Sequence, residues 1–597
     1  MRASISSSPD SLQWKAVARL RINPSIQVAV NMLECSRISF PHPTPERSKR
    51  GDEMLRDERS RWSGFVAIPL LFFLLAPGCR RERETVMIPM RDGIHLATDI
   101  YFPQTPGPHP ALLSRTPYGK SRLSTVAKEW SQEGYVVVTQ DIRGTNDSEG
   151  AFNLFYEDGW GEIEDGYDTI TWIEAQPWSN GEVCTFGASA LAITQLGAAG
   201  SVPPGMRCMV PVIVPSDGYQ DTAFQGGAFR KSLVENWLAS LGEEDLIPTV
   251  LEHYLMSEWW QERKFLERTD LVESTGFFVS GWFDIFQQGA LNAFMGLDAA
   301  GGEEALHRIV IGPWTHTGLY QRRQGELTFP ANAVSWTGAG NFELAWFDFW
   351  LRGIDSGITE EPAVYYYTMG DTDDPRAPGN EWKSADHWPV ESVATPYYLE
   401  GEGSLSPTLP ETSGALHFTY DPNDPVPTLG GNNLFLEAGP YDQRELEARD
   451  DVLTFTTPPL TTPLEVTGRV KARLWVSSDA PDTDFTVKLT DVYPDGRSIL
   501  VLDGIFRMRF REGFEREAFL VPGEIYEIEV DLWSTSIVFN EGHQIRVAVS
   551  SSNYPRFGIN TNRVDPPESG AEPRIANQTI HYGPDHPSQI LLPVVRP

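Results

Sequence analysis

The sequence predicts an α/β protein with a mostly parallel sheet, followed by an all-β domain. Apolar strand-like runs alternate with helix-like stretches from Glu84 to Leu351, which is typical of a parallel sheet covered on both faces. From about Pro389 the pattern changes to short alternating strands separated by Pro and Gly turns. A chain of 597 residues is too long for one ordinary core, so two or three domains are expected.

Composition restricts the partners of this chain. Asp and Glu number 82 against 48 Lys and Arg, giving a formal net charge of −34. That balance argues against nucleic acid or an anionic membrane surface as a partner, and it is typical of a solvated acidic surface. Four cysteines do not make a disulfide framework in a chain this long. Cys184 and Cys208 lie in apolar runs, where we expect small buried thiols.

The first 80 residues are predicted to be an extension outside the folded domains. Residues 1–53 are polar and irregular, and Met54 opens a segment that resembles an export signal with an apolar core at Phe65–Ala76. The segment ends in a sequence similar to a bacterial lipobox, with Cys79 as the residue to be lipidated. We therefore predict that translation starts at Met54 and that the protein is exported to the periplasm or tethered to the bacterial envelope. The alternative is an uncleaved apolar segment that anchors or packs.

Secondary-structure elements can be assigned in order from Glu84. Thr85–Met90 and Leu96–Tyr101 flank a turn at Arg91-Asp92-Gly93 and predict a hairpin. The strands and helices expected next are 111–113 (strand), 126–134 (helix), 135–139 (strand), 165–175 (helix), 183–188 (strand), 190–199 (helix) and 209–213 (strand).

The stretch Val183–Gln195 carries the first chemical signal. It passes from an apolar run through a tight turn of small residues into a run of good helix formers, with Ser189 at the apex. A strand that turns sharply into a helix with Ser at its apex is the nucleophile elbow of α/β-hydrolases, and the backbone N–H of Ala190 would face an oxyanion. The usual pattern has Gly two residues after the Ser, where this chain has Leu191. Alone, such a serine is more often a turn or cap residue.

Two later strands each end at a residue that completes the pattern. After a helical insertion at about 218–270, the strand 276–283 is followed by Asp284, and the strand 308–315 is followed by His316. The order Ser, acid, His, each on a loop after a strand, is that of the α/β-hydrolases. A Ser hydroxyl needs an imidazole base to act as a nucleophile, and that base needs an acid to fix its tautomer.

Other candidates fit this order less well. His307 precedes its strand and would lie at the wrong end of the sheet, and His253 lies in the helical insertion. Asp141 comes before Ser189, and with Arg143 it is expected to form an ion pair that fixes a loop. The sequence contains no Gly-rich phosphate loop and no metal-ligand cluster, so neither cofactor nor metal is expected.

Seven motifs together make the chain resemble a known family, the cocaine esterase/NonD (CocE/NonD) hydrolases. These share their architecture with X-Pro dipeptidyl-peptidases and α-amino acid ester hydrolases, and the resemblance covers about Glu84 to Pro597. The motifs are Arg115-Thr116-Pro117-Tyr118, Asp141-Ile142-Arg143-Gly144, Gln176-Pro177-Trp178-Ser179-Asn180-Gly181, the elbow around Ser189, Gly281-Trp282-Phe283-Asp284 with Gly312-Pro313-Trp314-Thr315-His316, and Asn553-Tyr554-Pro555-Arg556-Phe557.

The resemblance implies an α/β-hydrolase domain in two parts, 81–217 and 271–385. It also implies a helical cap at 218–270 and a C-terminal jelly-roll sandwich at 386–597, like the C-terminal domain of X-Pro dipeptidyl-peptidases. It implies the same triad of Ser189, Asp284 and His316. It adds Tyr118, whose hydroxyl would complete the oxyanion hole with the N–H of Ala190. The family usually has Gly-x-Ser-Tyr-x-Gly at the elbow, where this chain has Ala190 and Ala192 in place of the Tyr and the last Gly.

We therefore expect a cofactor-independent serine hydrolase that cleaves ester or amide bonds through an acyl-enzyme, as carboxylesterases do. The aromatic residues Trp282, Phe283 and Trp314 would line an apolar acyl pocket; equally, they could be core residues of their loops. Substrates would be small-molecule esters, amides or short peptides, and a homodimer is a reasonable expectation for the oligomeric state.

The sequence also leaves two rival functions open. An X-Pro dipeptidyl-peptidase needs acidic side chains that hold a free amino terminus, and the candidates in the cap are Glu243, Glu244 and Asp245. A surface binding protein would use the jelly roll to engage carbohydrate while its hydrolase site had decayed. An intact triad argues against that decay.

Overall fold

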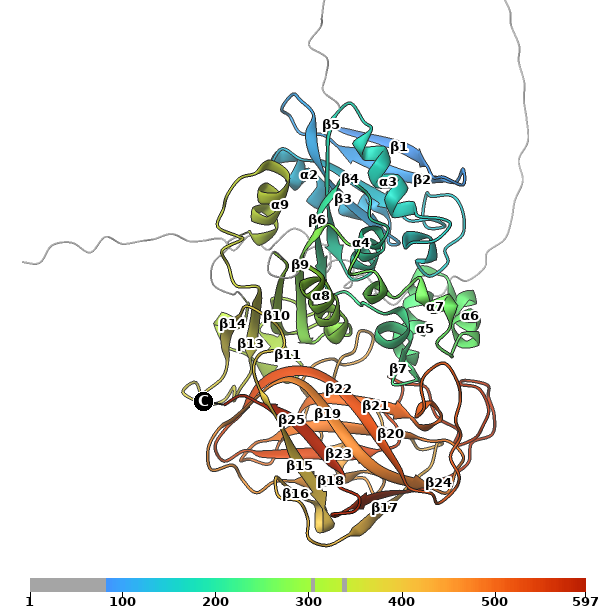
Figure 1. Ribbon diagram of the computed structural model, residues 1–597, viewed down its shortest axis with the longest axis vertical. Coiled ribbons are helices and arrows are strands. Elements are labelled where there is room, and N and C mark those ends of the chain that lie inside the picture. The colour runs from blue at the N-terminus through green and yellow to red at the C-terminus, as the bar shows by residue number, and fades with distance from the viewer. Residues whose placement is uncertain (1–81, 302–305, 335–340, 597) are drawn as a thin grey trace, which may run out of the picture.

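The computed structural model describes residues 82–301, 306–334 and 341–596. The predictions for residues 1–80, including Met54 and Cys79, lie outside these ranges. Figure 1 shows two parts, an α/β part coloured blue to yellow and an all-β part coloured orange to red below it. The described residues contain no helix that is both long enough and apolar enough to span a membrane.

Within the described residues, ten strands form one sheet in the order β1-β2-β4-β3-β5-β6-β9-β10-β13-β14. The run from β4 to β13 is parallel, and antiparallel pairs lie at both edges. The strands are β1 (Arg83–Pro89), β2 (His95–Tyr101), β3 (His109–Thr116), β4 (Val136–Asp141), β5 (Ser179–Ala188), β6 (Met206–Val212), β9 (Thr275–Phe283), β10 (Arg308–Thr315), β13 (Val364–Thr368) and β14 (Glu381–Ala385). The predicted hairpin and parallel sheet are thus confirmed.

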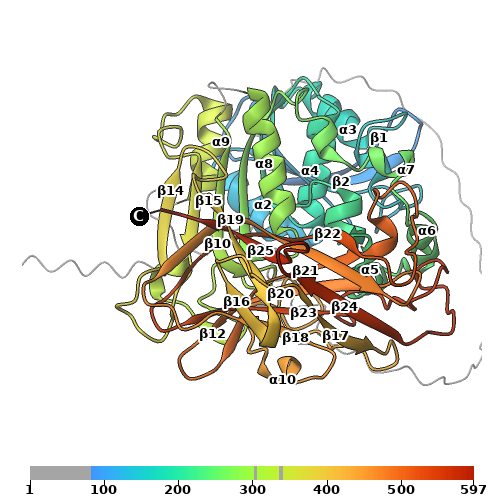
Figure 2. The same cartoon turned by 60° about the horizontal axis from the view of Figure 1, so that its bottom comes forward.

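Helices cover both faces of this sheet. On one face lie α2 (Ser124–Gln132) and α9 (Phe342–Arg352), whose Trp130 and Trp346 pack with Leu112 and Val137 in one buried cluster. On the other face lie α3 (Asp165–Glu174), α4 (Ala190–Gly200) and α8 (Gln287–Gly301), which Figure 2 shows on the same side of the sheet. Because both faces are buried, the strands are continuous apolar runs, as the sequence predicted.

The two cysteines of the central strands form a disulfide, which corrects the expectation of free buried thiols. Cys184 of β5 and Cys208 of β6 are register partners on adjacent strands, with their Cα atoms 4.6 Å apart. That separation lies within the usual reach of a disulfide. The sequence shows two cysteines in apolar runs but not that they stand opposite each other, so the bond could not be predicted from it.

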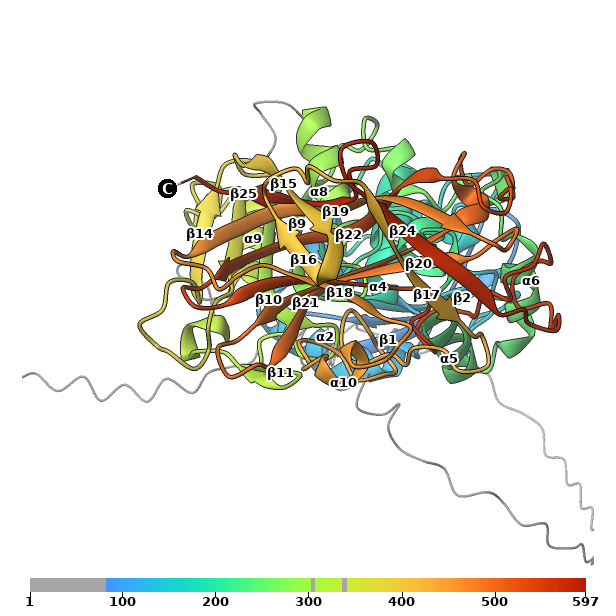
Figure 3. The ribbon, with the colours of Figure 1, turned by 90° about the horizontal axis from the view of Figure 1, so that it is seen from below.

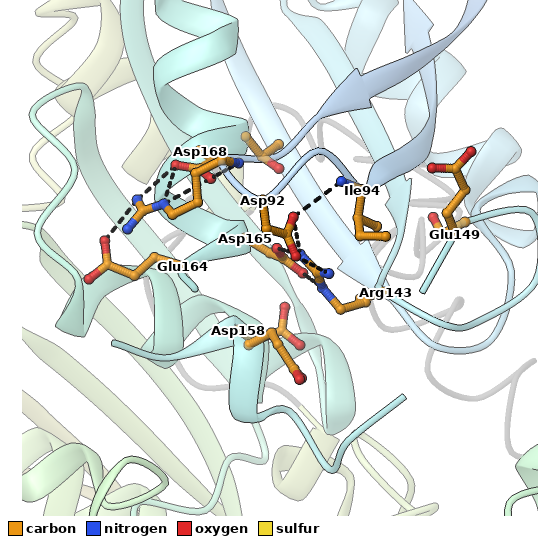
Figure 4. A network of polar contacts seen from close by, with 12 residues as sticks. Asp92, Ile94, Arg143, Glu149, Asp158, Glu164, Asp165 and Asp168 are labelled. Atoms are coloured by element: carbon orange, nitrogen blue, oxygen red, sulfur yellow. Dashed lines mark hydrogen bonds and ion pairs between the residues drawn. The ribbon is translucent and has the colours of Figure 1, made fainter. Parts of the chain in front are cut away.

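Arg143 and Asp141 do not pair with each other, contrary to expectation. Arg143 is held between Asp92 and Asp165, at 2.7 Å from each carboxylate (Figure 4). Asp141 instead accepts a hydrogen bond from the ammonium group of Lys120 at 2.9 Å. Asp141 and Arg143 lie two residues apart at the end of β4, and their side chains point to different partners, so the loop is fixed by separate sets of ion pairs.

Between β6 and β9 the chain forms a set of short helices beside the ten-stranded sheet. After a π-helical turn (Gly218–Ala223) and the small hairpin β7 (Phe224–Gln225) and β8 (Ala228–Phe229), it forms α5 (Lys231–Leu241), α6 (Ile247–Glu252) and α7 (Glu258–Gln261). Apolar side chains of these helices form a buried cluster of their own with Ile142 and Phe152 of the α/β part. The insertion is therefore packed against the α/β part rather than standing apart from it.

The C-terminal part is an all-β domain whose long strands cross one another in Figure 3. Its main path runs β17-β24-β19-β25-β15-β16-β18-β23-β20-β21, and β22 pairs with β19. The strands are β15 (Val393–Glu400), β16 (Ser404–Ser406), β17 (Gly414–Tyr420), β18 (Leu453–Thr456), β19 (Leu464–Ser478), β20 (Asp484–Val492), β21 (Ser498–Arg507), β22 (Tyr526–Phe539), β23 (Gln544–Ser550), β24 (Ala576–Tyr582) and β25 (Gln589–Val594). The all-β domain is confirmed; its jelly-roll arrangement stays a prediction.

Candidate active site

Ser189 lies at the sharp turn between β5 and α4. Its backbone has φ 58° and ψ −122°, in the left-handed region that residues with a side chain rarely adopt. The turn is held in place because the Ser189 N–H donates to the carbonyl of Val212 on the neighbouring strand at 2.9 Å. Strain of this kind persists only where the surroundings fix it, and here it presents the hydroxyl at the carboxyl edge of the sheet.

Gly187 makes this turn possible. Its φ is 136°, and a Cβ atom added to it would lie 2.6 Å from the Cβ atom of Leu191. Real Cβ atoms do not come that close, so positions 187 and 191 cannot both carry a side chain with this backbone. The chain therefore tolerates Leu191 where the common motif has Gly because Gly187 leaves the space free.

A chain of hydrogen bonds joins Ser189 to His316 and Asp284. The Nε2 atom of His316 lies 3.0 Å from the Ser189 hydroxyl oxygen, and its Nδ1 atom lies 2.6 Å from Oδ2 of Asp284. Both His316 and Asp284 are almost completely buried. Each follows the end of its strand, β10 or β9, so the structure brings together the three residues that the order of the motifs singled out.

Neighbouring groups hold Asp284 and His316 in place. The backbone N–H of Phe286 donates to Oδ1 of Asp284 at 2.7 Å, and the Phe286 ring packs edge-on against the His316 ring. The turn before His316 is held because Oε1 of Gln324 accepts hydrogen bonds from both the N–H and the hydroxyl of Thr315, at 2.9 Å each. The imidazole is therefore held from both sides.

Tyr118 lies on the loop after β3, and its hydroxyl is within hydrogen-bonding reach of Ser189. The indole Nε1 of Trp237, from α5, donates to the same hydroxyl at 2.9 Å. Burial raises the pKa of Tyr118 to about 12, against the opposing effect of the hydrogen bonds with Trp237 and Ser189. The phenol is therefore protonated at neutral pH and able to donate to an oxyanion.

A cavity with about 1080 Å³ of empty space, its open mouth included, has Ser189 and Ala190 in its wall. Its walls are mostly apolar and come from all parts of the fold. The main apolar lining residues are Leu154, Phe155, Trp160, Leu196, Trp237, Phe286 and, from the C-terminal domain, Leu434. The carboxylates of Asp158, Asp217 and Glu262 also line it. The size suits a small molecule or the end of a peptide.

The expected pocket residues Trp282, Phe283 and Trp314 do not line this cavity, which corrects that prediction. All three are buried in the core, and the indole N–H groups of Trp282 and Trp314 donate to the backbone carbonyls of Tyr367 and Ala333. The alternative interpretation as core residues of their loops is the one that the burial supports. They lie at the ends of strands whose side chains alternate between layers of the core, so nearness to Asp284 and His316 in sequence does not bring them to the cavity.

Other residues singled out earlier also lie away from the cavity. Glu244 and Asp245 are exposed and Glu243 is half-buried, and none of the three lines the cavity. His253 stacks on the Trp259 ring. His307 accepts a hydrogen bond from the Gly276 N–H through Nδ1, and burial lowers its pKa to about 4.

The sequence did not reveal that Trp237, Phe286 and Leu434 line the cavity. Trp237 belonged to a helical apolar pattern that indicated a cap, but the pattern does not tell which side faces the sheet. Phe286 is two residues beyond Asp284 and carries no motif of its own. Leu434 belongs to the C-terminal domain, and only the docking of the two domains brings it to the cavity. Among the described residues, no three His, Cys, Asp or Glu side chains gather as metal ligands would.

Comparisons with known proteins agree with this architecture. Residues 92–247 and 236–318 match the model of the X-Pro dipeptidyl-peptidase (S15 family), and residues 356–591 match that of the X-Pro dipeptidyl-peptidase C-terminal non-catalytic domain. The chain is 37% identical to cocaine esterase of Rhodococcus sp. (strain MB1 Bresler) over 580 residues, covering 86% of this chain and 98% of that protein.

Solved structures give the same result. An aminopeptidase from a marine sediment Thaumarchaeota archaeon superposes with a TM-score of 0.76 at 27% identity, covering 86% of this chain and 96% of that one. An α-amino acid ester hydrolase superposes with a TM-score of 0.74 at 25% identity, covering 89% and 100%. All these relatives are hydrolases with an α/β-hydrolase domain and a C-terminal β domain. The chain therefore belongs to the cocaine esterase/NonD family of hydrolases, within the serine esterases and peptidases of the S15 type.

Proposed function

We propose that the protein is a serine esterase that transfers an apolar acyl group to water through an acyl-enzyme. The single observation that carries the proposal is the hydrogen-bonded chain from Ser189, in the wall of a mostly apolar cavity, through His316 to Asp284. A hydroxyl, an imidazole and a buried carboxylate in this order are the groups that acyl transfer needs.

Each group has one role in the reaction. Ser189 Oγ attacks the ester carbonyl carbon while His316 Nε2 takes its proton, and Asp284 holds the imidazolium that forms. The tetrahedral intermediate collapses, and His316 returns the proton to the departing alkoxide. Water then attacks the acyl-Ser189 ester with the same base, which releases the carboxylic acid and restores the hydroxyl.

The negative oxygen of the intermediate would be stabilised by two donors. One is the hydroxyl of Tyr118, which burial keeps protonated. The other is the N–H of Ala190, the first residue of α4, which has no partner within its own helix. Both donors are fixed by the fold before the substrate binds, which is what makes such groups effective.

The cavity lining supports esters with bulky apolar or aromatic acyl groups as the preferred substrates. Phe155 and Trp237 have their rings stacked 5.7 Å apart, and both line the cavity next to the elbow. Aromatic walls bury large apolar area and favour flat acyl groups. The 37% identity with a cocaine esterase supports ester rather than peptide chemistry.

An aminoacyl or X-Pro dipeptide substrate is the second candidate. The observation that favours it is a pair of cavity carboxylates, Asp217 and Glu262, of which the Oε2 atom of Glu262 is buried without a hydrogen-bond partner. A carboxylate in the cavity wall attracts the ammonium group of a free amino terminus. The acidic residues expected for this role, Glu243 to Asp245, do not line the cavity.

The proposal is tested with a panel of three substrates and two proteins. An aryl benzoate, an aryl acetate and a Gly-Pro anilide are offered to the purified protein and to the Ser189→Ala variant. We expect the benzoate to be the best substrate and turnover to fall in the variant by about 10⁴-fold or more. Preference for the anilide would favour the peptidase. A folded wild-type protein that is inert towards all three and towards a fluorophosphonate probe would support the decayed binding protein.

We also propose that the protein is exported. The disulfide between Cys184 and Cys208 supports this, because structural disulfides persist mainly in oxidising compartments outside the cytosol. N-terminal sequencing of the protein from its native host tests the proposal and the start at Met54 together. A mature chain that retains any of residues 1–53 would contradict them.

A further inference from the structure

The backbone turn that carries Asp284 is held by side chains from outside the α/β-hydrolase core. The turn runs from Trp282 at the end of β9 to Gln287 at the start of α8. Within it, the Asp284 N–H donates to the carbonyl of Gly281 at 2.9 Å, and the Gln287 N–H donates to the carbonyl of Asp284 at 3.2 Å. These local bonds leave the carbonyls of Trp282 and Ile285 to partners elsewhere.

Asn432 of the C-terminal domain binds both sides of this turn. Its Nδ2 amide donates to the carbonyl of Asp284 at 2.7 Å and to that of Trp282 at 3.2 Å. Because both acceptors are carbonyl oxygens, the amide must present its NH₂ group to them, and its two hydrogens serve one carbonyl each. Asn432 is only 3% exposed, so water cannot take over this role.

We propose that Asn432 is a positioning residue for the catalytic acid, so that the C-terminal domain completes the active site rather than only accompanying it. The proposal rests on the proposed esterase function, because it concerns the same triad. Asn432 does not touch the substrate or the reacting atoms. It fixes the carbonyl of Asp284 itself and that of Trp282, two residues earlier, and thereby the direction from which the carboxylate meets His316.

The segment that carries Asn432 is built to be rigid. Gly431 and Gly439 exchange two backbone hydrogen bonds, at 2.8 and 2.9 Å, which close the loop between them. Asn433 donates from its side chain to the carbonyl of Gly430 at 2.7 Å. Gly431 has φ 87°, and a Cβ atom there would lie 2.9 Å from a guanidinium nitrogen of Arg556, so the backbone rests directly on that buried cation. Because its own backbone is fixed in this way, Asn432 can fix the turn that carries Asp284.

The same loop reaches the cavity, and the cap supplies a second support. Leu434 lines the cavity two residues after Asn432, so one loop fixes the acid and shapes the acyl site. From the other side, a guanidinium nitrogen of the buried Arg230 donates to the carbonyl of Ile285 at 3.0 Å. The α/β part, the helical insertion and the C-terminal domain thus meet at the turn that carries Asp284, the residue that orients His316.

The consequence for catalysis follows from geometry. A carboxylate that turns away from Nδ1 no longer holds the imidazole in the tautomer that accepts the Ser189 proton. Displacements of about 1 Å in such groups cost on the order of 10²-fold in rate. Substrate binding, which depends on the apolar walls, should change much less.

The test replaces Asn432 by Leu, which has a similar volume and no donors. We expect Asn432→Leu to lower kcat for the aryl benzoate by about 10- to 100-fold with KM changed less than about threefold. The matched control is Ser534→Ala, which removes the 2.8 Å hydrogen bond from Ser534 to Gln288, another buried contact between the C-terminal domain and α8. It should leave kcat unchanged.

A double-mutant cycle separates positioning from a merely structural role. If Asn432 acts through Asp284, Asn432→Leu should cost less than about threefold in an Asp284→Ala background, because the group it positions is gone. All variants are compared by circular dichroism and thermal unfolding. If Asn432→Leu does not fold, Asn432→Ala replaces it in the cycle, because it removes the amide without added bulk.

The outcomes are distinct. A kcat of Asn432→Leu equal to that of Ser534→Ala, or the same loss in both backgrounds, would overturn the proposal. An inactive wild-type protein would instead contradict the esterase function on which the proposal rests. The two failures are therefore told apart by the wild-type rate.

Discussion

The indole N–H of Trp237 donates to the hydroxyl of Tyr118 at 2.9 Å, joining the helical insertion to the oxyanion site. An indole nitrogen can only donate, so it occupies a lone pair of the phenol oxygen. The single proton of Tyr118 is then directed elsewhere, towards Ser189 and the place where an oxyanion would form. Trp237 of α5 therefore both lines the cavity and orients the hydroxyl of Tyr118.

Tyr118→Phe should lower kcat for ester hydrolysis by about 10²- to 10³-fold, because it removes one oxyanion donor and keeps the ring. KM should change little. Steady-state kinetics with the aryl benzoate measure kcat and KM separately. A loss confined to KM would mean that Tyr118 serves binding alone.

Trp237→Phe keeps an aromatic wall but removes the N–H that orients Tyr118. We expect kcat to fall by about 10-fold, the equivalent of roughly 1.4 kcal/mol for one hydrogen bond. In the Tyr118→Phe background the same change should have little further effect on kcat. Full additivity of the two losses would contradict the coupling between these side chains.

Removing the disulfide should lower stability without abolishing activity. The bond joins residues 24 apart in sequence. For a loop of that length, the double variant Cys184→Ala/Cys208→Ala should lose about 3 kcal/mol of unfolding free energy. Urea denaturation followed by tryptophan fluorescence measures the difference, and thiol titration of the denatured wild-type protein checks that the bond is present. Equal stability of the two proteins would show that the cysteines are not joined.

His543 should make stability depend on pH near neutrality. Burial opposes its positive charge, but the hydrogen bond and ion pair with Asp491 at 2.9 Å, together with Asp371, outweigh burial and raise its pKa above 6.5. A raised pKa in the folded state means that the stabilisation is complete below pH 6.5 and is lost as pH rises through the folded-state pKa.

The measurement is the melting temperature of the wild-type protein and of His543→Gln across pH 6 to 9. The difference between the two curves should shrink as pH rises, because only the wild-type protein loses the charge. A constant difference would show that His543 does not titrate in this range.

Gly187→Ala should disable the elbow, because its Cβ atom would meet that of Leu191 at 2.6 Å. We expect at least a tenfold loss of kcat, or about 1.4 kcal/mol. Adding Leu191→Ala should not rescue the variant, since the opposing Cβ atom remains, whereas Leu191→Gly should restore part of the rate. Rescue by Leu191→Ala would show that the bulk of the leucine, not its Cβ atom, is the obstacle.

Much of the architecture could be predicted from the sequence because its signals are local. Apolar runs separated by helical stretches gave the parallel sheet, and Ser189, Asp284 and His316 each follow a strand. In a parallel sheet the carboxyl ends of the strands share one edge, so order along the chain becomes nearness in space. Residues placed in this way are expected to lie within hydrogen-bonding distance of one another, and the three residues do form hydrogen bonds.

What could not be predicted depends on which strands and domains are neighbours. Cys184 and Cys208 bond because β5 and β6 are adjacent in a given register, which composition does not reveal. Trp282 and Trp314 turn into the core because of the pleat and a bulge in β10, although they stand next to the site in sequence. Asn432 reaches Asp284 only through the docking of two domains.

The close approach of positions 187 and 191 also constrains how this elbow can change over generations. While Gly187 is kept, position 191 can carry a residue larger than glycine, as Leu191 shows. The φ of 136° favours glycine at 187 whatever residue stands at 191, and the Cβ atom of Leu191 adds a steric reason of its own. A search pattern that demands glycine two residues after the serine will therefore pass over chains that carry a larger residue there and keep the same turn.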